Sequence, residues 1–522
     1  MYSWLKQHQN TVYCAVLIVI CAICTWGNSL ITISLVVFGV FWLAQIPSRQ
    51  NFKLLTERRT PLIVIACCAL FILRNVWQLP DSDTGVEMSR WVVVALFTLF
   101  AASLPSLSRK QFFIVLILLT LSVSFNSVFN FVWFILTKPT TSSVRGAFMF
   151  MSYNHFVLYC LMAISVCIYY VLFQSHTHVP RYLKLTFIAC ALWLVFYLIF
   201  LKSITGYVGL LIISIFAIIE RIRQYKRYDF LIIFLALFSV IGVKIGYEAN
   251  FFLNPDRIDR EHLDTHTAQG NPYAPFVQKG IIENGHWNKL YISHKELHEN
   301  WHVYSDIPLD SINTKGFTIY ANLIRYMTSK NLRKDAQGLA QLTPQDIRNI
   351  EQGFSNYRFT SPLDFGSRIY ETLGELYITQ QNYNPSGKSL VQRSVYWQVG
   401  FAIFLEHPFF GSGTKRYEEE YRLRYAALNI PKQYWLRTHN QYLRIATVYG
   451  GVGFVCFIGM LILIPIYSRK KTTLLFGVNY SVFLISMISE DVLSEINGIM
   501  FFSLLCVLFL YAQPNKEEKT IN

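Results

Sequence analysis

Residues 111–136 read QFFIVLILLTLSVSFNSVFNFVWFIL, a stretch without a single charged side chain. A bilayer core about 30 Å thick needs roughly 20 apolar residues in a helix, so this stretch predicts a membrane-spanning helix. Further apolar runs lie near 11–26, 29–46, 61–79, 91–105, 155–174, 185–202, 206–220, 229–246, 441–467, 473–489 and 498–513. The sequence therefore predicts an all-α polytopic membrane protein with about twelve transmembrane helices, the first of them retained and not removed as a signal peptide.

The composition agrees with a membrane protein and argues against a nucleic-acid-binding one. The 522 residues are 53% hydrophobic and 15% charged, whereas soluble domains carry about 25% charged residues. The formal net charge is +15, but residues 249–438 hold 21 basic and 19 acidic side chains. Most of the positive excess therefore accompanies the apolar runs, where it reports membrane topology.

The short loops predict the orientation of the chain. Loops on the same side as the N-terminus carry eighteen Lys and Arg, and the opposite short loops carry only Arg90, Lys138 and Arg145. Positively charged loops resist translocation, so both termini are expected on the cytoplasmic side. We accordingly expect transmembrane helices 1–9 in residues 1–248, a large outer loop domain in 249–438, and helices 10–12 with a cytoplasmic tail in 439–522.

The large outer loop is expected to fold as a mainly helical domain. It is rich in Tyr, Trp and Phe and has no Gly/Ser or Pro tract. Thr343-Pro344 with Asp346 has the pattern of a helix start, and Ser389–Glu406 has apolar residues at helical spacing up to His407-Pro408. All ten cysteines fall in apolar runs, so we expect no disulfide framework in the loop.

Arginine and histidine side chains gather where this loop is expected to return to the membrane. Arg393 opens an apolar helix, His407-Pro408 ends it, and His439-Asn440 stands at the start of the next span. An imidazole can accept a proton near neutral pH, and an Arg fork can hold two phosphate oxygens. By itself, His439 is more often a cap or interface residue, and a carboxylate would also satisfy Arg393. Gly450, Gly451 and Gly453 lie inside an apolar span and are expected to permit close helix packing, not to bind phosphate.

The order of these motifs resembles the O-antigen ligase and O-antigen polymerase superfamily. The resemblance is carried by Arg393, Tyr396-Trp397, His407-Pro408, Gly411-Ser-Gly413, His439-Asn440 and Gly450-Gly451-Val-Gly453. An earlier segment, from Arg145-Gly146 to Asn154-His155, resembles the family's entry into its central helices. Twelve spans with one large outer loop before the last three also match the ligase topology.

The resemblance implies a GT-C-like glycosyltransferase of lipopolysaccharide biosynthesis in the bacterial inner membrane, with the large loop in the periplasm. It implies inverting, metal-independent transfer of a preassembled glycan from undecaprenyl pyrophosphate to an acceptor, in ligases the lipid A core. His439 would then be the catalytic base and Arg393 a pyrophosphate ligand, with Asn440, His407 and Arg444 in support. No cofactor and no metal are expected, and the partners are lipid-linked glycans and membrane lipid.

One stretch departs from the family pattern. The family places an Arg after Ser near the outer end of a central span, whereas residues 202–207 read KSITGY. Ile204 or Thr205 takes that position, and Lys202 or Arg145 would have to supply the missing charge. Lys is a point charge without the Arg fork, so the geometry of phosphate binding would differ.

Two other functions fit the sequence. A polymerase would use the same donor but extend a second lipid-linked repeat, and a transporter or flippase of lipid-linked sugars would form no new glycosidic bond. The ordered outer loop argues against the transporter. Glu418-Glu-Glu420 with Arg422 and Arg424 is expected to be an exposed helical face with ion pairs one turn apart.

Overall fold

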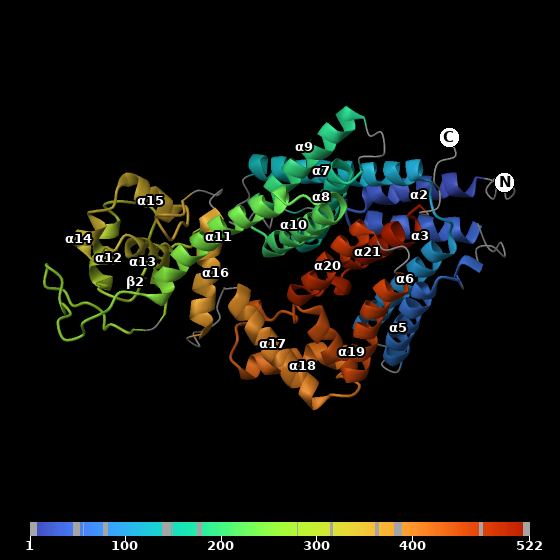
Figure 1. Ribbon diagram of the computed structural model, residues 1–522. Coiled ribbons are helices and arrows are strands. Elements are labelled where there is room, and N and C mark those ends of the chain that lie inside the picture. Colours follow the sequence, from blue (N-terminus) through green and yellow to red (C-terminus); the bar gives the residue numbers. More distant parts are fainter. Residues whose placement is uncertain are drawn as a thin grey trace. The chain divides into compact units, whose positions relative to one another are not determined.

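The computed structural model is helical, apart from one short hairpin among the residues it describes (Figure 1). The described residues are 8–44, 53–55, 57–76, 82–137, 148, 150–174, 180–278, 280–313, 317–360, 365–380, 389–468 and 473–514. The chain forms two compact units, one comprising residues 1–135, 148–230 and 395–522 and the other residues 136–147 and 231–394. The expected loop domain, 249–438, is thus shared between the two units.

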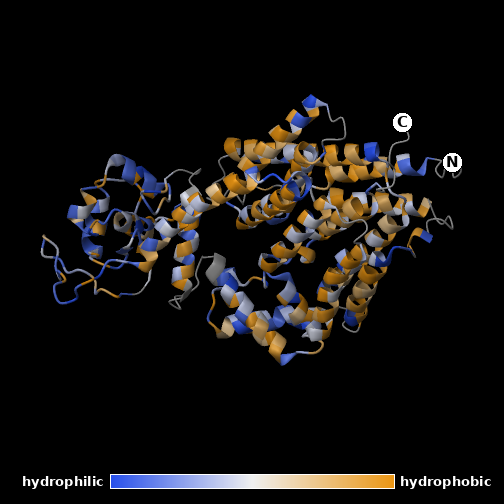
Figure 2. Ribbon diagram, viewed as in Figure 1, coloured by the Kyte–Doolittle hydropathy of each residue, from blue (hydrophilic) through white to orange (hydrophobic). Residues whose placement is uncertain are grey.

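The first unit is built from apolar helices, which are coloured orange in Figure 2. Its apolar helices are α2 (Gln9–Ile23), α3 (Asn28–Ala44), α5 (Arg59–Val76), α6 (Ser82–Ser103), α7 (Arg109–Thr137), α8 (Tyr153–Leu172), α9 (Arg181–Phe200), α10 (Ile204–Tyr225), α19 (Gln441–Tyr467), α20 (Leu474–Ser489) and α21 (Ile496–Cys506), the last continued by a π-helical turn at Val507–Tyr511. With α11 (Asp229–Leu253), every predicted apolar run is a helix. Among the described residues, eight helices are long and apolar enough to cross a membrane, and four apolar helices are shorter.

Helix α8 lies at the centre of the first unit. Its side chains from His155 to Cys167 are all buried, and it packs against α9, α10 and α20. A helix that is apolar all round is stable only when other helices surround it or lipid does, and here protein surrounds it. The amino end of α8 is therefore held in a fixed place, and this end carries Ser152, Asn154 and His155.

Two helices precede α19. They are α17 (Ser389–Glu406), of which the part from Val395 belongs to the first unit, and α18 (Thr414–Ala427), and a single turn at Lys432–Tyr434 follows. Helix α17 has the bounds that the sequence predicts. Tyr417, Tyr421 and Tyr425 are spaced four residues apart on α18, so they share one helix face, and all three are buried.

The segment between α17 and α18 docks onto α19 through its backbone. Gly451 N donates to Pro408 O at 2.7 Å, and Gly413 N donates to Val448 O at 3.0 Å. Gly411 and Gly450 both have positive φ, and a Cβ on either would lie within 2.6 Å of the other segment's backbone. The two glycines thus permit the loop to pass directly against a kink in α19. At Gly450 the close contact is therefore with a loop, and not with another helix as the sequence predicts. Gly453 does serve helix packing, since Phe71 of α5 lies 3.4 Å from where its Cβ would be.

The second unit joins α11 to a small polar domain with its own core. Its other elements are the hairpin strands β1 (Ile282–Glu283) and β2 (His286–Trp287), and the helices α12 (His294–Trp301), α13 (Ile319–Ser329), α14 (Ala336–Leu339), α15 (Pro344–Glu351) and α16 (Phe365–Gln380). Leu297, Trp301, Leu323, Met327 and Ile350 lie in its core. The two-residue turn of the hairpin is Asn284-Gly285, both with positive φ, as a tight hairpin turn requires. The sequence did not predict this hairpin.

Helix α15 begins as its sequence predicts. Thr343 and Asp346 form a capping box, in which the Thr343 side chain accepts from Asp346 N and the Asp346 carboxylate accepts from Thr343 N at 2.8 Å. Burial raises the pKa of Asp346, but hydrogen bonds from Lys330, Thr343 and Tyr326 outweigh it and lower the pKa to about 2. All ten cysteines are free thiols, as expected.

Candidate functional site

The segment that leads into α19 is held by one buried carboxylate. Asp491, in the turn after α20, accepts a hydrogen bond from Asn440 N at 2.7 Å and another from the Thr438 hydroxyl at 3.0 Å. The Asn440 side chain caps α19 by accepting from Leu443 N at 3.0 Å. Burial raises the pKa of Asp491, while the positive charge of Arg444 acts in the opposite direction. Residues 438–440 are therefore fixed on both sides of His439.

Aromatic side chains complete this frame. Trp397 of α17 donates its indole N–H to Thr438 O at 3.0 Å, and the Tyr417 hydroxyl lies 3.2 Å from the Thr438 hydroxyl. Because the Thr438 hydroxyl donates to Asp491, Tyr417 is the donor in its own contact. Burial raises the pKa of Tyr417 to about 12, which keeps this donor proton in place.

His439 itself has a left-handed backbone, with φ of 46°. Such a conformation costs a non-glycine residue of the order of 1 kcal/mol and is most often found where the site requires it. The imidazole Nδ1 lies 3.2 Å from Oε2 of Glu490, and Asn154 donates to Oε1 of the same carboxylate at 2.5 Å. The carboxylate at Nδ1 favours the tautomer with its hydrogen on Nδ1, which leaves the lone pair on Nε2.

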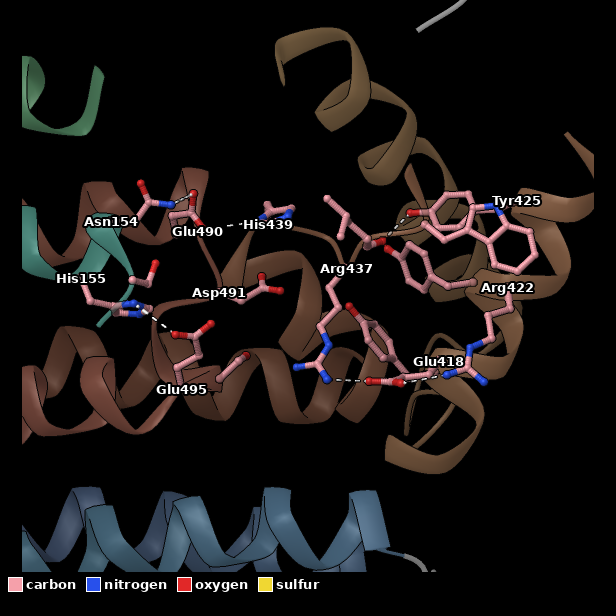
Figure 3. A pocket seen from close by; sticks show the side chains of 16 residues that line it. Asn154, His155, Glu418, Arg422, Tyr425, Arg437, His439, Glu490, Asp491 and Glu495 are labelled. Carbon is pink, nitrogen blue, oxygen red and sulfur yellow. Dashed lines mark hydrogen bonds and ion pairs between the residues drawn. The ribbon is translucent and has the colours of Figure 1, made fainter. Parts of the chain in front are cut away.

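His439 lines a pocket of about 550 Å³ whose walls come entirely from the first unit (Figure 3). The pocket is lined by Ser152, Asn154 and His155 at the start of α8, by Tyr417, Glu418, Tyr421, Arg422 and Tyr425 of α18, by Trp435, Leu436, Arg437 and His439 before α19, and by Glu490, Asp491, Ser494 and Glu495 between α20 and α21. Four segments of the chain thus meet in one cavity, and the one at the start of α8 is more than 260 residues from the other three in sequence. The volume lies in the range of about 300–1,000 Å³ that is usual for small-molecule sites.

The pocket contains two histidine–carboxylate pairs. The first is His439 with Glu490, and the second is His155, whose Nδ1 lies 3.3 Å from Oε2 of Glu495. Figure 3 shows both pairs on one side of the pocket, with Arg437, Glu418 and Arg422 on the other side. The amino end of α8 lies on the side of the two histidine–carboxylate pairs, and its partial positive charge stabilises the nearby carboxylates.

The two arginines of the pocket share one carboxylate. Arg437 lies 2.8 Å and Arg422 3.7 Å from Glu418. The sequence predicts the Glu418–Arg422 pair one turn apart on α18, and this pair is present. Glu420 and Arg424 behave differently from that prediction, since Glu420 pairs with His407 at 3.1 Å and Arg424 with Glu406 at 2.5 Å.

Arg444 has a structural environment. It is buried, 2.9 Å from the equally buried Glu87 of α6, and its guanidinium lies over the Tyr417 ring. Arg90 also contacts Glu87, at 3.0 Å. A buried charge must be paired, so this cluster fixes the register of α6 against the first turn of α19.

The other predicted site residues lie outside the lining of the pocket. Arg393 is half-buried on α17, at a position that belongs to the second unit, and a role shared with His439 stays a prediction. Lys202 has positive φ and lies in the turn after α9, while Ile204 and Thr205 line a separate apolar pocket of about 160 Å³ between α10 and α20. Arg145 lies outside the described residues.

Within the described ranges, one group of side chains has its oxygen and nitrogen atoms close enough together to hold a metal ion. It consists of Glu406, His407 and Glu420, whose atoms lie within 4.8 Å of one another. None of the three lines the pocket, and Glu406 already contacts Arg424. His407 therefore belongs to the loop that docks on α19 and not to the wall around His439.

The acidic half of the site is what sequence reasoning missed. Glu490, Asp491 and Glu495 stand in a short loop between two apolar runs, and Glu87 lies just before another apolar run. A carboxylate pair beside an apolar run was a usable signal, because His155 and His439 stand at the starts of two other apolar runs. The Tyr417, Tyr421 and Tyr425 stripe was a second signal, at helical spacing.

Residues 351–458, about a fifth of the chain, match the family model described as O-antigen ligase (Wzy_C). The match confirms the resemblance that the motifs indicated, and it includes Arg393, His407 and His439. The opposite wall of the pocket, residues 152–155 and 490–495, lies outside the matched residues. No curated protein and no solved structure matches the chain.

Proposed function

We propose that this protein is an inverting, metal-independent glycosyltransferase of the O-antigen ligase type. It would span the bacterial inner membrane about twelve times, with both termini in the cytoplasm and the pocket at the periplasmic face. There it would transfer a preassembled glycan from undecaprenyl pyrophosphate to an acceptor hydroxyl, most simply that of the lipid A core. The observation that carries the proposal is His439, which lies within the residues that match the ligase family and is held in the pocket by Glu490.

The geometry of His439 suits a general base. With Nδ1 bonded to Glu490, Nε2 would accept the proton of the acceptor hydroxyl as that oxygen bonds to the anomeric carbon of the donor. The bond from this carbon to the pyrophosphate oxygen breaks, and undecaprenyl pyrophosphate leaves with the electron pair. A single displacement inverts the anomeric centre. Glu490 would stabilise the imidazolium that forms, as the third member of a hydrolase triad does.

Cationic side chains would bind the leaving pyrophosphate. Arg393, Lys202 and Arg145 are the candidates, and fixed positive charge in a dry site stabilises a developing anion without a metal ion. Asn440, His407 and Arg444 would support the site indirectly. Asn440 caps α19, His407 stands in the docked loop, and Arg444 pairs with Glu87.

The test uses purified protein in lipid nanodiscs with an undecaprenyl-pyrophosphate glycan, a lipid A core acceptor and EDTA. We expect a gel shift of the acceptor that survives EDTA, is lost in His439→Ala, and falls strongly in Arg393→Ala. His262→Ala is the matched control, because His262 is exposed in the second unit and paired with Asp259. Transfer by His439→Ala at the wild-type rate would refute the mechanism.

The same assay distinguishes the two rival functions. Growth of the donor chain without acceptor would identify a polymerase. Movement of the donor across the membrane without a new glycosidic bond would identify a transporter. Loss of the gel shift in EDTA, restored by a divalent cation, would refute the metal-independent mechanism.

A further inference from the structure

Two buried polar side chains of the pocket lack a hydrogen-bond partner among the described residues. Neither ring nitrogen of His155 forms a hydrogen bond to a described residue, although the side chain is only 6% exposed. Nδ1 is paired with Glu495 Oε2 at 3.3 Å, so Nε2 is the ring nitrogen that a ligand would satisfy. The Ser494 hydroxyl is also without one, and Ser494 is 3% exposed. Buried polar groups are nearly always hydrogen-bonded, and both of these line the pocket. A ligand that enters the pocket would satisfy them.

The charges around them argue against an anionic ligand. Glu490, Asp491 and Glu495 line this side of the pocket, and Glu418 lies opposite. The two pocket arginines already contact Glu418. A phosphate placed beside His155 would face the carboxylates of Glu490 and Glu495, and such repulsion is strong where water is scarce.

A metal ion does not fit this place either. Among the described residues, the group with metal-ligand geometry is Glu406, His407 and Glu420, which lies outside the pocket. The oxygen and nitrogen atoms of His155, Glu490 and Glu495 do not converge in that way. The pocket chemistry is therefore that of hydrogen bonding to a neutral ligand.

A sugar meets these conditions. Its hydroxyls donate to carboxylates and both accept from and donate to an imidazole and a serine hydroxyl. Its apolar ring faces pack on aromatic side chains, and Tyr421, Tyr425 and Trp435 form part of the wall. The Glu495 side chain is 53% exposed, so it has room to adjust to a hydroxyl.

We propose that His155, Ser494 and Glu495 form a hydroxyl-binding subsite for the acceptor sugar, in the same pocket as His439. This inference rests on the proposed function and deepens it. The subsite holds ring hydroxyls of the acceptor so that one further hydroxyl faces His439. The pyrophosphate of the donor is bound outside this carboxylate-lined pocket.

The kinetic test compares Ser494→Ala and His155→Phe with Ser503→Ala. Ser503 is a matched control, because its hydroxyl is also buried without a hydrogen-bond partner among the described residues, yet it does not line the pocket. We expect each pocket variant to raise the KM for the acceptor about 3- to 10-fold, the effect of one lost hydrogen bond. The KM for the donor and the melting temperature should stay at the Ser503→Ala values. An unchanged acceptor KM, or a raised donor KM instead, overturns the proposal.

A binding test separates this proposal from the proposed function. Deacylated core oligosaccharide and a deacylated O-antigen repeat are titrated against the nanodisc protein. Occupancy is followed by the tryptophan fluorescence of Trp435, which is the part of the signal that Trp435→Phe removes. Binding by the wild type that weakens in Ser494→Ala supports the subsite, even when no transfer is seen or His155→Phe does not fold. If neither glycan binds the wild type, or if both bind Ser494→Ala as tightly as they bind the wild type, the subsite is refuted. Loss of transfer in His439→Ala would still support the transferase in that case.

Discussion

At the scale of single residues, the site depends on how His439 is held. Asp491 bonds to both neighbours of His439, and Glu490 bonds to its ring. The two adjacent carboxylates thus differ in role. Asp491 fixes the segment around His439, and Glu490 orients the imidazole. The strained φ of His439 is stable because the bonds on both sides fix the segment.

Glu490→Gln should lower kcat for glycan transfer by about 10²-fold and leave the acceptor KM within about twofold. The amide removes the negative charge that stabilises the imidazolium, but it does not alter the rest of the pocket. Initial rates at saturating donor and acceptor measure the effect. Glu299→Gln, on the exposed face of α12, is the control. A fall in kcat no larger than that of the control would show that Glu490 does not act through His439.

At the scale of elements, the kink of α19 at Gly450 makes room for the α17–α18 loop. Gly450 has φ of 70° inside the helix, and the loop backbone occupies the space where its side chain would be. The motif Gly411-Ser-Gly413 therefore has a structural task. It lets Ser412 and Gly413 donate to the carbonyls of Thr447 and Val448, which the kink leaves without helical partners.

Gly450→Ala should destabilise the protein by about 2 kcal/mol or more, because the Cβ would lie 2.3 Å from Phe409 O and the backbone conformation is strained. Gly459→Ala on the same helix has nothing within 4 Å of the added Cβ and should be neutral or slightly stabilising. Thermal unfolding in detergent compares the two. Equal melting temperatures would contradict this account of the kink.

The stability of helix α15 depends on pH through the carboxylate of Asp346. The folded pKa of Asp346, about 2, lies below its ordinary value of 3.8. The stabilisation is therefore complete above about pH 5 and is lost as the pH falls toward 2. Asp346→Asn should reduce the amide protection of α15 about 5- to 10-fold at pH 7, since a cap contributes about 1 kcal/mol.

Hydrogen exchange at pH 7 and pH 3, corrected for intrinsic rates, measures this difference. The difference in amide protection between the wild type and Asp346→Asn should be smaller at pH 3 than at pH 7. Asp310→Asn is the control, because its side chain is 85% exposed. A difference that does not shrink with acid would mean that the carboxylate charge is not what stabilises the cap.

At the scale of the whole molecule, the charge of the short loops predicts that the polar domain of the second unit lies outside the cell membrane. Glu299→Cys on α12 should react with a membrane-impermeant thiol reagent in spheroplasts. Arg223→Cys, at the end of α10, should react only after lysis. Wild-type protein gives the background of its ten cysteines, none of which is exposed. Labelling of both variants in intact spheroplasts would contradict the topology.

The sequence determined the helices, two helix starts and one helix end in the large loop, and the resemblance to the ligase family. These are local properties, since hydropathy, capping residues and short motifs act within a few residues of one another. It also singled out His439, because a polar ring at the mouth of an apolar span is visible in one dimension.

Only the tertiary structure decided what surrounds His439. Glu490 is 51 residues away, His155 meets Glu495 across 340 residues, and Glu87 pairs with Arg444 across 357. Such pairs depend on how α8, α19 and the α20–α21 turn pack, and packing is a sum of many weak contacts that no local pattern encodes. The sequence thus singled out His439 at the start of an apolar run, and packing placed it in a pocket that Glu490, Asp491 and Glu495 also line.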